Sequence, residues 1–316
     1  MGSLTIAKLK GKASFQDLGR DTTQHLGFSG SGAADEYSYL LANNLLGNGC
    51  SDAAIEVTLG QVVLVAKQYC KMVITGANCQ PFIFKENRQT LPLKNGKVFE
   101  LFQGDTLHLG IPKSQLHSYI AIAGGFSAKH WLGSVSQTTN EMPLGFTEPT
   151  LSQGDKLFFS ADAQTQPLKE VKTQPDYFHQ STQLTLRFLP STLWHNWTPL
   201  HQEELIKQHF TITPQSNRMG YRMSGEPLRQ QRITQSLSKP VNLGAIQLPA
   251  DGQPIVLMKE RQTIGGYPLV GTVIQTDLFR LSQKRPGEQV NFVPVTLEQA
   301  QAQLLAFKSK FGLFSN

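Results

Sequence analysis

The sequence predicts a mainly β protein with a few helices, divided between two lobes. Short β-branched segments bounded by Gly, Pro or Asn recur along the chain, whereas helical periodicity is confined to a few stretches. The chain has 316 residues, and a single hydrophobic core stops growing efficiently at about 250–300 residues. Two lobes, each built mainly from strands, are therefore expected.

Six segments have the composition of β-strands, because they are rich in β-branched residues and are bounded by turn formers. They cover residues 56–66, 71–77, 117–126, 156–161, 184–190 and 253–258.

One turn device recurs ahead of strand-like residues. The segments QGDTLHL (103–109), QGDKLFF (153–159) and PGEQVNF (286–292) each place a glycine and an acid before an alternating pattern. Because glycine adopts positive φ at little cost, each segment predicts a tight turn that leads into a strand. The repetition indicates that similar β-rich units are used more than once.

Helical patterns are fewer, and the clearest covers residues 35–46. Asp35 is placed to act as its N-cap or first-turn acid, and Gly47 ends it. Apolar residues inside it recur at helical spacing. Three more helices are expected, at 200–210, 276–283 and 296–311.

The junction between the lobes is expected in the polar stretch 161–180, which has two prolines and no clear periodicity. The predicted division is an N-terminal lobe of residues 1–170 and a C-terminal lobe of residues 171–316.

Composition and charge exclude several classes of protein. The formal charge is +6, but the basic residues form no run of five or more, so no nucleic-acid partner is expected. Three cysteines without CxxC spacing and histidines without HExxH spacing predict neither a disulfide framework nor a metal site. The chain shows neither a signal peptide nor an apolar run near ~18 residues, which favours the cytoplasm over a membrane.

The first candidate site is the glycine-rich stretch 27–36, GFSGSGAADE, which precedes the first predicted helix. Gly30, Ser31 and Gly32 lead to a helix N-terminus, where free amides and the helix dipole favour an anion. The alternative is a tight turn into a packed helix with Asp35 as its cap. The residues alone favour the turn, since the Lys-Ser/Thr pair of a phosphate loop is missing.

The second candidate site is NRMGYRMSGEPL (217–228). Arg218 and Arg222 flank Gly220 and Tyr221, and in an extended chain both arginines would share one face. Paired guanidinium groups suit a carboxylate, carbamate or phosphate. The alternative is that they are surface cations or partners of Glu226.

The third candidate site is LMKERQTIGGYPLVGTVIQTDL (257–278). Polar groups at a strand end beside a double-glycine turn can line a ligand site, although a hairpin with a polar rim would look similar. The residues concerned are Lys259, Arg261, Gln262, Thr263, Gly265, Gly266 and Tyr267. LMKE lacks the second Met of a biotinylated-lysine motif, so no covalent biotin is expected on this chain.

Together these three stretches resemble the biotin-dependent carboxyltransferase/allophanate hydrolase subunit 2 family, whose bacterial members include the C subunits of 5-oxoprolinases. The resemblance runs from about residue 12 to residue 293 and is most specific in the second and third stretches. It implies two β-barrel lobes of cyclophilin-like fold.

The resemblance implies part of an ATP-dependent amide hydrolase that opens the 5-oxoproline lactam to glutamate and needs two partner proteins, its B and A components. ATP would be bound by this chain or by a partner. One alternative is the carboxyltransferase component of a urea carboxylase, which takes its carboxyl group from biotin in trans. Another alternative is a regulatory binding protein that antagonises a kinase inhibitor.

In the implied chemistry, cations and hydrogen-bond donors face the negative charge that develops on a lactam oxygen. The candidate catalytic residues are Arg218, Arg222, Lys259, Arg261 and Asp35, and the candidate substrate-binding residues are Gly30, Ser31, Gly32, Tyr221, Gln262, Thr263, Gly265, Gly266 and Tyr267. Segment 133–150 lacks arginines that relatives carry, and Ile264 stands where they have threonine. Both departures concern the substrate rather than the fold.

Overall fold

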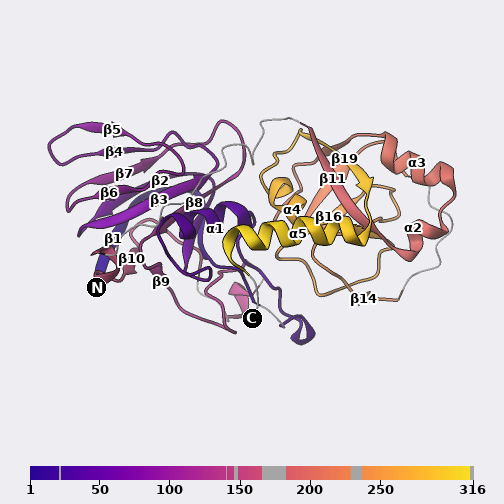
Figure 1. Ribbon diagram of the computed structural model, residues 1–316, viewed down its shortest axis with the longest axis horizontal. Helices are drawn as coiled ribbons and strands as arrows, with labels where there is room; N and C mark the ends of the chain where they lie inside the picture. The colour runs from indigo at the N-terminus through magenta and orange to yellow at the C-terminus, as the bar shows by residue number, and fades with distance from the viewer. Residues whose placement is uncertain (21–22, 140, 146–148, 166–182, 229–236, 314–316) are drawn as a thin grey trace. The chain divides into compact units, whose positions relative to one another are not determined.

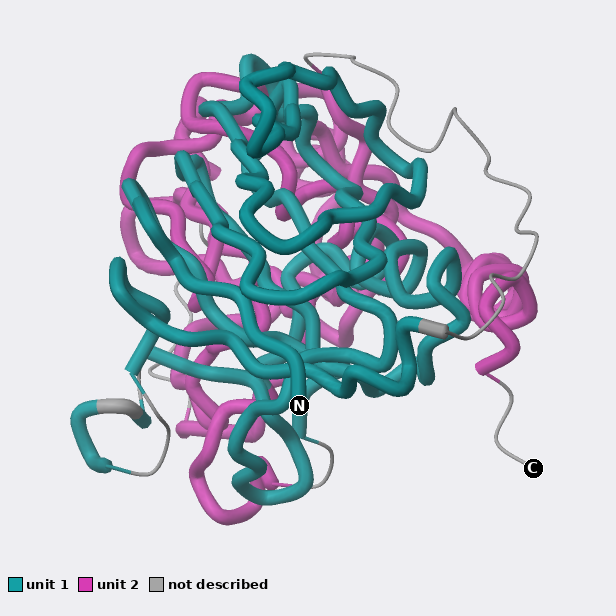
Figure 2. The backbone as a smooth tube through the Cα atoms, turned by 90° about the vertical axis from the view of Figure 1, so that its left-hand side faces the viewer, with its two compact units in different colours: residues 1–21, 31–177 teal, residues 22–30, 178–316 magenta. Residues whose placement is uncertain are grey.

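The structure is a computed structural model that describes residues 1–316 except 21–22, 140, 146–148, 166–182, 229–236 and 314–316. The chain divides into two compact units (Figure 2). Unit 1 comprises residues 1–21 and 31–177, and unit 2 comprises residues 22–30 and 178–316. The predicted boundary at residues 170/171 falls outside the described residues and stays a prediction.

Unit 1 is built on one ten-stranded sheet (Figure 1). Its centre is β1 (Gly2–Gln16), which pairs antiparallel with β2 (Ala54–Ala66) and with β10 (Lys156–Phe159). The main path runs β5-β4-β7-β2-β1-β10-β9, and β8 joins β2 to β3, which also pairs with β6. The remaining strands are β3 (Cys70–Gly76), β4 (Phe82–Phe84), β5 (Thr90–Pro92), β6 (Phe99–Leu101), β7 (Thr106–Leu109), β8 (His117–Ile122) and β9 (Phe126–Ser127).

The core of unit 1 lies where alternate residues of these strands point to the same face. At the start of β1, Leu4 and Ile6 are buried while Ser3 and Thr5 between them are only partly buried, as period-two packing requires. Helix α1 (Glu36–Leu45) packs on β3 and β8, and eight of its ten residues are buried. Short 3-10 turns cover Gln24–Leu26, Met142–Leu144 and Asp162–Thr165.

Unit 2 contains a closed barrel of seven strands in the order β11-β18-β15-β16-β13-β12-β19. Strands β11 and β19 close it in parallel, and the other neighbours in that order are antiparallel. A separate pair, β14 with β17, lies outside the barrel order. The strands are β11 (Gln183–Pro190), β12 (Phe210–Ile212), β13 (Gly220–Ser224), β14 (Lys239–Pro240), β15 (Ala245–Gln247), β16 (Ile255–Leu257), β17 (Ile264–Gly265), β18 (Leu269–Val273) and β19 (Gln289–Pro294).

Four helices accompany the barrel in the described part of unit 2: α2 (Thr192–Asn196), α3 (Pro199–Lys207), α4 (Gln275–Ser282) and α5 (Leu297–Phe311). Helix α5 begins with a capping box between Thr296 and Gln299 and ends at Gly312 in the left-handed conformation. It packs on α4, where the rings of Phe279 and Phe307 lie 4.8 Å apart.

The predicted turn device is present in both units. Gly104, Gly154 and Gly287 all have positive φ, and each precedes a strand of its unit. The acid after each glycine accepts a hydrogen bond from the amide three residues before it, at 2.6–2.9 Å. The three glycine-acid pairs therefore form the same type of tight turn, as the sequence predicts.

The predicted fold class, mainly β with a few helices, is confirmed. Barrel closure occurs in unit 2, whereas the strands of unit 1 form the branched ten-stranded sheet. Among the described residues, no helix combines the length and the apolar character that crossing a membrane would take.

An ion pair between a buried carboxylate and a partly exposed arginine fixes α4 to the barrel. Two nitrogens of the Arg187 fork, Nε and Nη2, donate to the carboxylate oxygens of Asp277 at 2.9 and 2.6 Å, and the Arg187 amide donates to the same carboxylate. Asp277 is fully buried. Loss of Asp277 removes the charged acceptor of three hydrogen bonds, one of them from a backbone amide.

Asp277→Ala is therefore expected to lower the free energy of unfolding of unit 2 by about 3 kcal/mol. For a unit of this size that corresponds to a fall in Tm of roughly 6–12 °C, measurable by calorimetry. Glu203→Ala is the matched control, because its pair with Lys207 is exposed, and it should cost no more than about 0.5 kcal/mol. Equal losses of stability in the two variants would contradict a structural role for the Arg187–Asp277 pair.

Candidate functional site

Three consecutive charged residues follow β16 and are buried. Lys259, Glu260 and Arg261 are each less than a tenth exposed. The tight turn in which they lie is held by the Arg261 amide, which donates to the carbonyl of Met258 at 3.2 Å. Burial of charged side chains is costly unless they are paired or bind something, so this turn is the most unusual polar feature of unit 2.

Glu260 has a partner from the second candidate stretch. Nε of Arg218 donates to its Oε1 at 2.6 Å, and the Glu260 amide donates to the Arg218 carbonyl at 2.8 Å. The structure therefore brings the second and third stretches together. Glu260, not Glu226, is the acid that pairs with Arg218.

Arg261 is different, because no carboxylate in the described part of the chain lies within ion-pair distance of its guanidinium group. Its Nε donates to the carbonyl of Val241 at 3.3 Å. Burial lowers the pKa of the Arg261 guanidinium to about 10. The group therefore remains charged at neutral pH, and an anion beside it would recover part of the solvation that burial removes.

A buried amide lies beside the same segment. Gln247 on β15 is 1% exposed, and its Nε2 has no hydrogen-bond partner among the residues that the structure describes. A Cβ at Gly265 would lie 2.5 Å from this nitrogen and 3.3 Å from Cγ1 of Val241. The absence of a side chain at Gly265 thus leaves room for the Gln247 amide. Val241 links Gly265 to Arg261, because its side chain lies beside Gly265 and its carbonyl accepts the Arg261 hydrogen bond.

Arg261, Gly265 and Gln247 lie around Val241, and Lys259 lies two residues before Arg261 in the same buried turn. A guanidinium, an ammonium and an amide donor are groups that can hold a small anion with a carbonyl oxygen. We call Gln247, Lys259, Arg261 and Gly265 the barrel cluster. Gln247 is the member that the sequence did not predict. A glutamine in an otherwise apolar strand, GAIQL, was the available signal.

The other predicted site residues of unit 2 differ in burial and in hydrogen bonding. The Thr263 carbonyl accepts from the Val241 amide at 3.1 Å beside the β14–β17 pair. The Tyr221 hydroxyl is buried and donates to the Ser282 carbonyl at 2.8 Å, which ties β13 to the end of α4. Exposed side chains or backbone are found at Arg222, Gln262, Ile264, Gly266 and Tyr267.

The expectation that Arg218 and Arg222 share one face of an extended chain is wrong. Strand β13 begins at Gly220, so Arg218 lies in the bend before it and turns to Glu260. Arg222 is within the strand and is exposed. Glycine at 220 allows the close approach to Ile255 that this bend needs.

The first candidate stretch belongs to unit 1 from Ser31 onward, while Gly30 is grouped with unit 2. Ser31 has φ 52° and Gly32 has φ 98°, and a Cβ at Gly32 would lie 2.5 Å from the Leu18 carbonyl oxygen. These conformations turn the chain sharply into α1. Asp35 caps the helix by accepting from the Ser38 amide at 3.1 Å.

Protein groups occupy the amides at the start of α1. The Ala33 amide donates to the Asp17 carbonyl, the Ala34 amide to Oε2 of Glu56, and the Asp35 amide to the Tyr119 hydroxyl, at 2.8–2.9 Å. The carboxylates of Asp35 and Glu56 are both buried there. The segment before α1 therefore forms a tight turn, and its amides at residues 33–35 bond within the protein.

Comparison with known proteins identifies the family. The model of the carboxyltransferase domain, subdomain A and B, matches residues 26–294. The chain belongs to this carboxyltransferase-domain family. The match includes both the barrel cluster and the loop before α1.

Relatives in bacteria match nearly the whole chain. The C subunit of 5-oxoprolinase from Escherichia coli (strain K12) is 32% identical over 292 residues, which cover 90% of this chain and 89% of that protein. The 5-oxoprolinase C subunit of Haemophilus influenzae is 31% identical, with coverage of 94% and 93%. The urea amidolyase of Saccharomyces cerevisiae is 28% identical over 95% of this chain, which corresponds to 17% of that longer protein.

Solved structures support the fold. The urea amidolyase of K. lactis superposes with a TM-score of 0.85 over 99% of this chain and 20% of its own, at 21% identity. The urea carboxylase of Kluyveromyces lactis gives a TM-score of 0.86 over 99% of this chain and 29% of its own, also at 21% identity. The fold of this chain therefore also occurs as part of much longer chains.

Proposed function

We propose that this chain is the C subunit of an ATP-dependent 5-oxoprolinase that opens the lactam ring of 5-oxoproline to give glutamate. The two bacterial relatives named as 5-oxoprolinase C subunits align with it over about nine-tenths of both chains. The observation on which the proposal depends is Arg261, a buried guanidinium without a carboxylate partner in the described chain, beside a buried amide donor.

Each group of the barrel cluster has a part in this chemistry. Water adds to the lactam carbonyl carbon, the ring C–N bond breaks, and the nitrogen takes a proton. Arg261 and Lys259 stabilise negative charge on the carbonyl oxygen or hold the substrate carboxylate, and Nε2 of Gln247 donates a hydrogen bond. Glu260 and Arg218 neutralise each other and hold the turn in position.

We assign the nucleotide to the partner proteins. Just before α1, the Ala34 amide donates to the buried carboxylate of Glu56, and this negative charge disfavours a nucleotide phosphate beside it. The B and A components would then supply ATP chemistry, and this chain would supply the lactam-binding groups.

Reconstitution tests the proposal. The purified chain is combined with the B and A components, 5-oxoproline and ATP, and glutamate is measured against mixtures that lack one component. Glutamate formation that requires all three proteins is expected. The proposal is wrong if the complete mixture forms no more glutamate than the mixture without this chain.

Similarity to urea amidolyase supports a second candidate, a carboxyl transfer to urea from biotin bound on another protein. This candidate expects a biotinylated protein to co-purify with the chain and to be detected with streptavidin. It also expects urea-dependent, rather than 5-oxoproline-dependent, turnover of ATP. The two activities distinguish the candidates in the same set of assays.

Gly265→Ala tests the place of Gln247 in the cluster. The new methyl group would displace the end of a buried side chain, so the free energy of unfolding should fall by about 1 kcal/mol. The displaced amide should lower 5-oxoprolinase activity about tenfold, within the range that a shift of about 1 Å can cause. Activity and Tm are measured together.

Two further variants make this test specific. Gln247→Ala lacks the amide that the new methyl group would meet, so adding Gly265→Ala to it should cause no further loss of activity. The effects of the two substitutions would then be non-additive. Gly49→Ala is the control, because a Cβ there meets nothing closer than 3.5 Å. Additive losses in the double variant would show that Gly265 acts independently of Gln247.

A further inference from the structure

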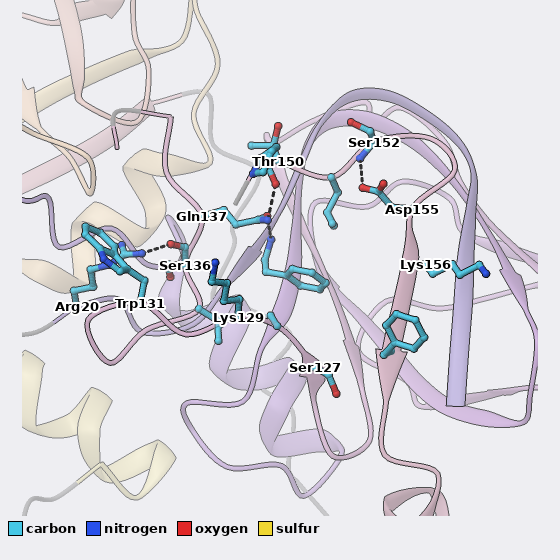
Figure 3. Close-up of a pocket in the computed structure, with 16 residues that line it drawn as sticks. Arg20, Ser127, Lys129, Trp131, Ser136, Gln137, Thr150, Ser152, Asp155 and Lys156 are labelled. Atoms are coloured by element: carbon cyan, nitrogen blue, oxygen red, sulfur yellow. Dashed lines mark hydrogen bonds between the residues drawn. The ribbon is translucent and has the colours of Figure 1, made fainter. Parts of the chain in front are cut away.

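Unit 1 contains a pocket that is separate from the barrel cluster. Its volume is about 430 Å³, and all of its lining residues belong to unit 1 (Figure 3). The walls come from the end of β1, the segment after β9, residues 135–137, residues 149–152 and strand β10. Part of the lining therefore comes from the segment 133–150.

The charge of the lining is positive. Arg20, Lys129 and Lys156 contribute three cations, against the single acid Asp155. The Asp155 carboxylate already accepts a hydrogen bond from the Ser152 amide at 2.8 Å, as part of its own turn. In the view of Figure 3, Arg20 lies at one end, Lys156 lies at the other end, and Lys129 lies between them. The field inside the pocket therefore favours an anion.

Arg20 is held rigidly at its end of the pocket. It is 4% exposed, its guanidinium carbon lies 4.6 Å from the centre of the Trp131 ring, and its Nη2 donates to the Ser136 carbonyl. Stacking on an indole and a hydrogen bond to backbone fix the plane of the guanidinium group. A fixed plane gives the directional binding that a mobile surface arginine lacks.

Gln137 connects two segments of the pocket lining. Its Oε1 accepts from the Phe15 amide at 2.8 Å, and its Nε2 donates to the Pro149 carbonyl at 2.7 Å. Its own amide donates to the Phe15 carbonyl at 3.0 Å. The buried side chain of Gln137 thus joins β1 to Pro149, and these hydrogen bonds hold the two segments of the pocket wall in fixed positions.

Apolar surface accompanies the cations. Phe15, Ala128, Val135, Leu151 and Phe158 line the pocket along with Trp131, and Phe158 is 42% exposed. A ligand with only charge would leave this surface in contact with water, whereas a ligand with an apolar or planar part would cover it.

We propose that this pocket of unit 1 binds a small organic anion, whose carboxylate or phosphate group meets Arg20 and Lys129 and whose apolar or planar part packs on Trp131, while Lys156 adds positive charge at the other end of the pocket. The site is independent of the proposed 5-oxoprolinase chemistry, since none of its residues belongs to the barrel cluster.

Binding of matched probes to the full chain tests the site. Benzoate and phenyl phosphate combine a ring with an anion, benzamide is the neutral counterpart of benzoate, and inorganic phosphate has no ring. Binding is followed by tryptophan fluorescence, because Trp131 lines the pocket while Trp194 and Trp197 are buried in unit 2. The fluorescence change is lost in Trp131→Phe, so binding to this variant is measured by calorimetric titration.

The expected result is that benzoate or phenyl phosphate binds at least about fivefold more tightly than both benzamide and inorganic phosphate. Whichever of the two anions binds more tightly identifies the head group. Lys129→Ala and Lys156→Ala should each weaken that binding by up to about fivefold, the range for exposed charges, and added salt should weaken it further.

Lys67→Ala is the matched control, because Lys67 is an exposed lysine of unit 1 that does not line the pocket. Lys129 and Lys156 are exposed as well, so their replacement should leave Tm unchanged. The proposal is overturned if benzamide binds as tightly as the anions, if no probe binds, or if Lys67→Ala weakens binding as much as the two pocket variants do.

Discussion

Arg261→Ala is expected to lower the rate of glutamate formation in the reconstituted 5-oxoprolinase by about 10²–10³-fold. That is the usual cost of removing one donor that faces developing negative charge in a site shielded from water. Arg261 is 7% exposed, and within the described residues no acid compensates its charge. Steady-state rates at saturating 5-oxoproline and ATP measure the effect.

The stability of the same variant separates a functional role from a structural one. Because burial lowers the pKa of Arg261 to about 10, the charged side chain destabilises the folded state at neutral pH. Its removal should leave the free energy of unfolding unchanged or raise it by about 1 kcal/mol. A large fall in Tm together with the loss of rate would mean that Arg261 supports the fold instead.

Two other arginine variants refine this test. Arg261→Lys keeps a positive charge but loses the planar fork, so it should recover only part of the rate. Arg222→Ala removes an exposed arginine from β13, and it should lower the rate less than about fivefold. If Arg222→Ala were as damaging as Arg261→Ala, the exposed face of β13 would be part of the site.

Four of the five described α-helices, all except α2, and the glycine-acid turns were predictable because their causes are local. The Asp35 cap, the capping box of α5 and the three glycine-acid turns depend on residues within four positions of one another. The six predicted strand segments all contain strands of the structure.

The longest strand, β1, was not predicted, and its register explains why. Pairing with β2 shifts between Ile6 and Lys8 and again between Lys10 and Lys12, so the alternation of apolar residues is broken. Gly11, with φ 94°, lies at the second shift. Period-two patterns fail across such irregularities, although the sheet continues through them.

The barrel cluster was predictable only in part. The buried charges at 259 and 261 stand out as polar residues at a strand end. Gln247 joins them through Gly265, 18 positions along the chain, across a contact that only the folded barrel creates. The pocket of unit 1 was not predictable for the same reason, since its cations come from separate segments around residues 20, 129 and 156.

The acid Glu56 is the centre of the buried network that shapes the loop before α1. Its Oε2 accepts hydrogen bonds from the Ala34 amide and from the Tyr119 hydroxyl, both at 2.8 Å, and its Oε1 lies 3.5 Å from Nδ1 of His117. Burial and the neighbouring carboxylate of Glu56 raise the pKa of Tyr119 well above its ordinary value. The hydroxyl therefore remains protonated and remains a donor to Glu56.

Glu56→Ala is accordingly expected to lower the free energy of unfolding of unit 1 by about 3–4 kcal/mol, because it leaves two buried donors without their acceptor and creates a cavity. The Tm of unit 1 should fall by roughly 6–16 °C in calorimetry. Glu100→Ala is the matched control, since Glu100 also accepts from a tyrosine, Tyr69 at 2.6 Å, but on the surface. It should cost under about 1 kcal/mol. Equal losses of stability in the two variants would contradict the inference that the contribution of Glu56 depends on its burial.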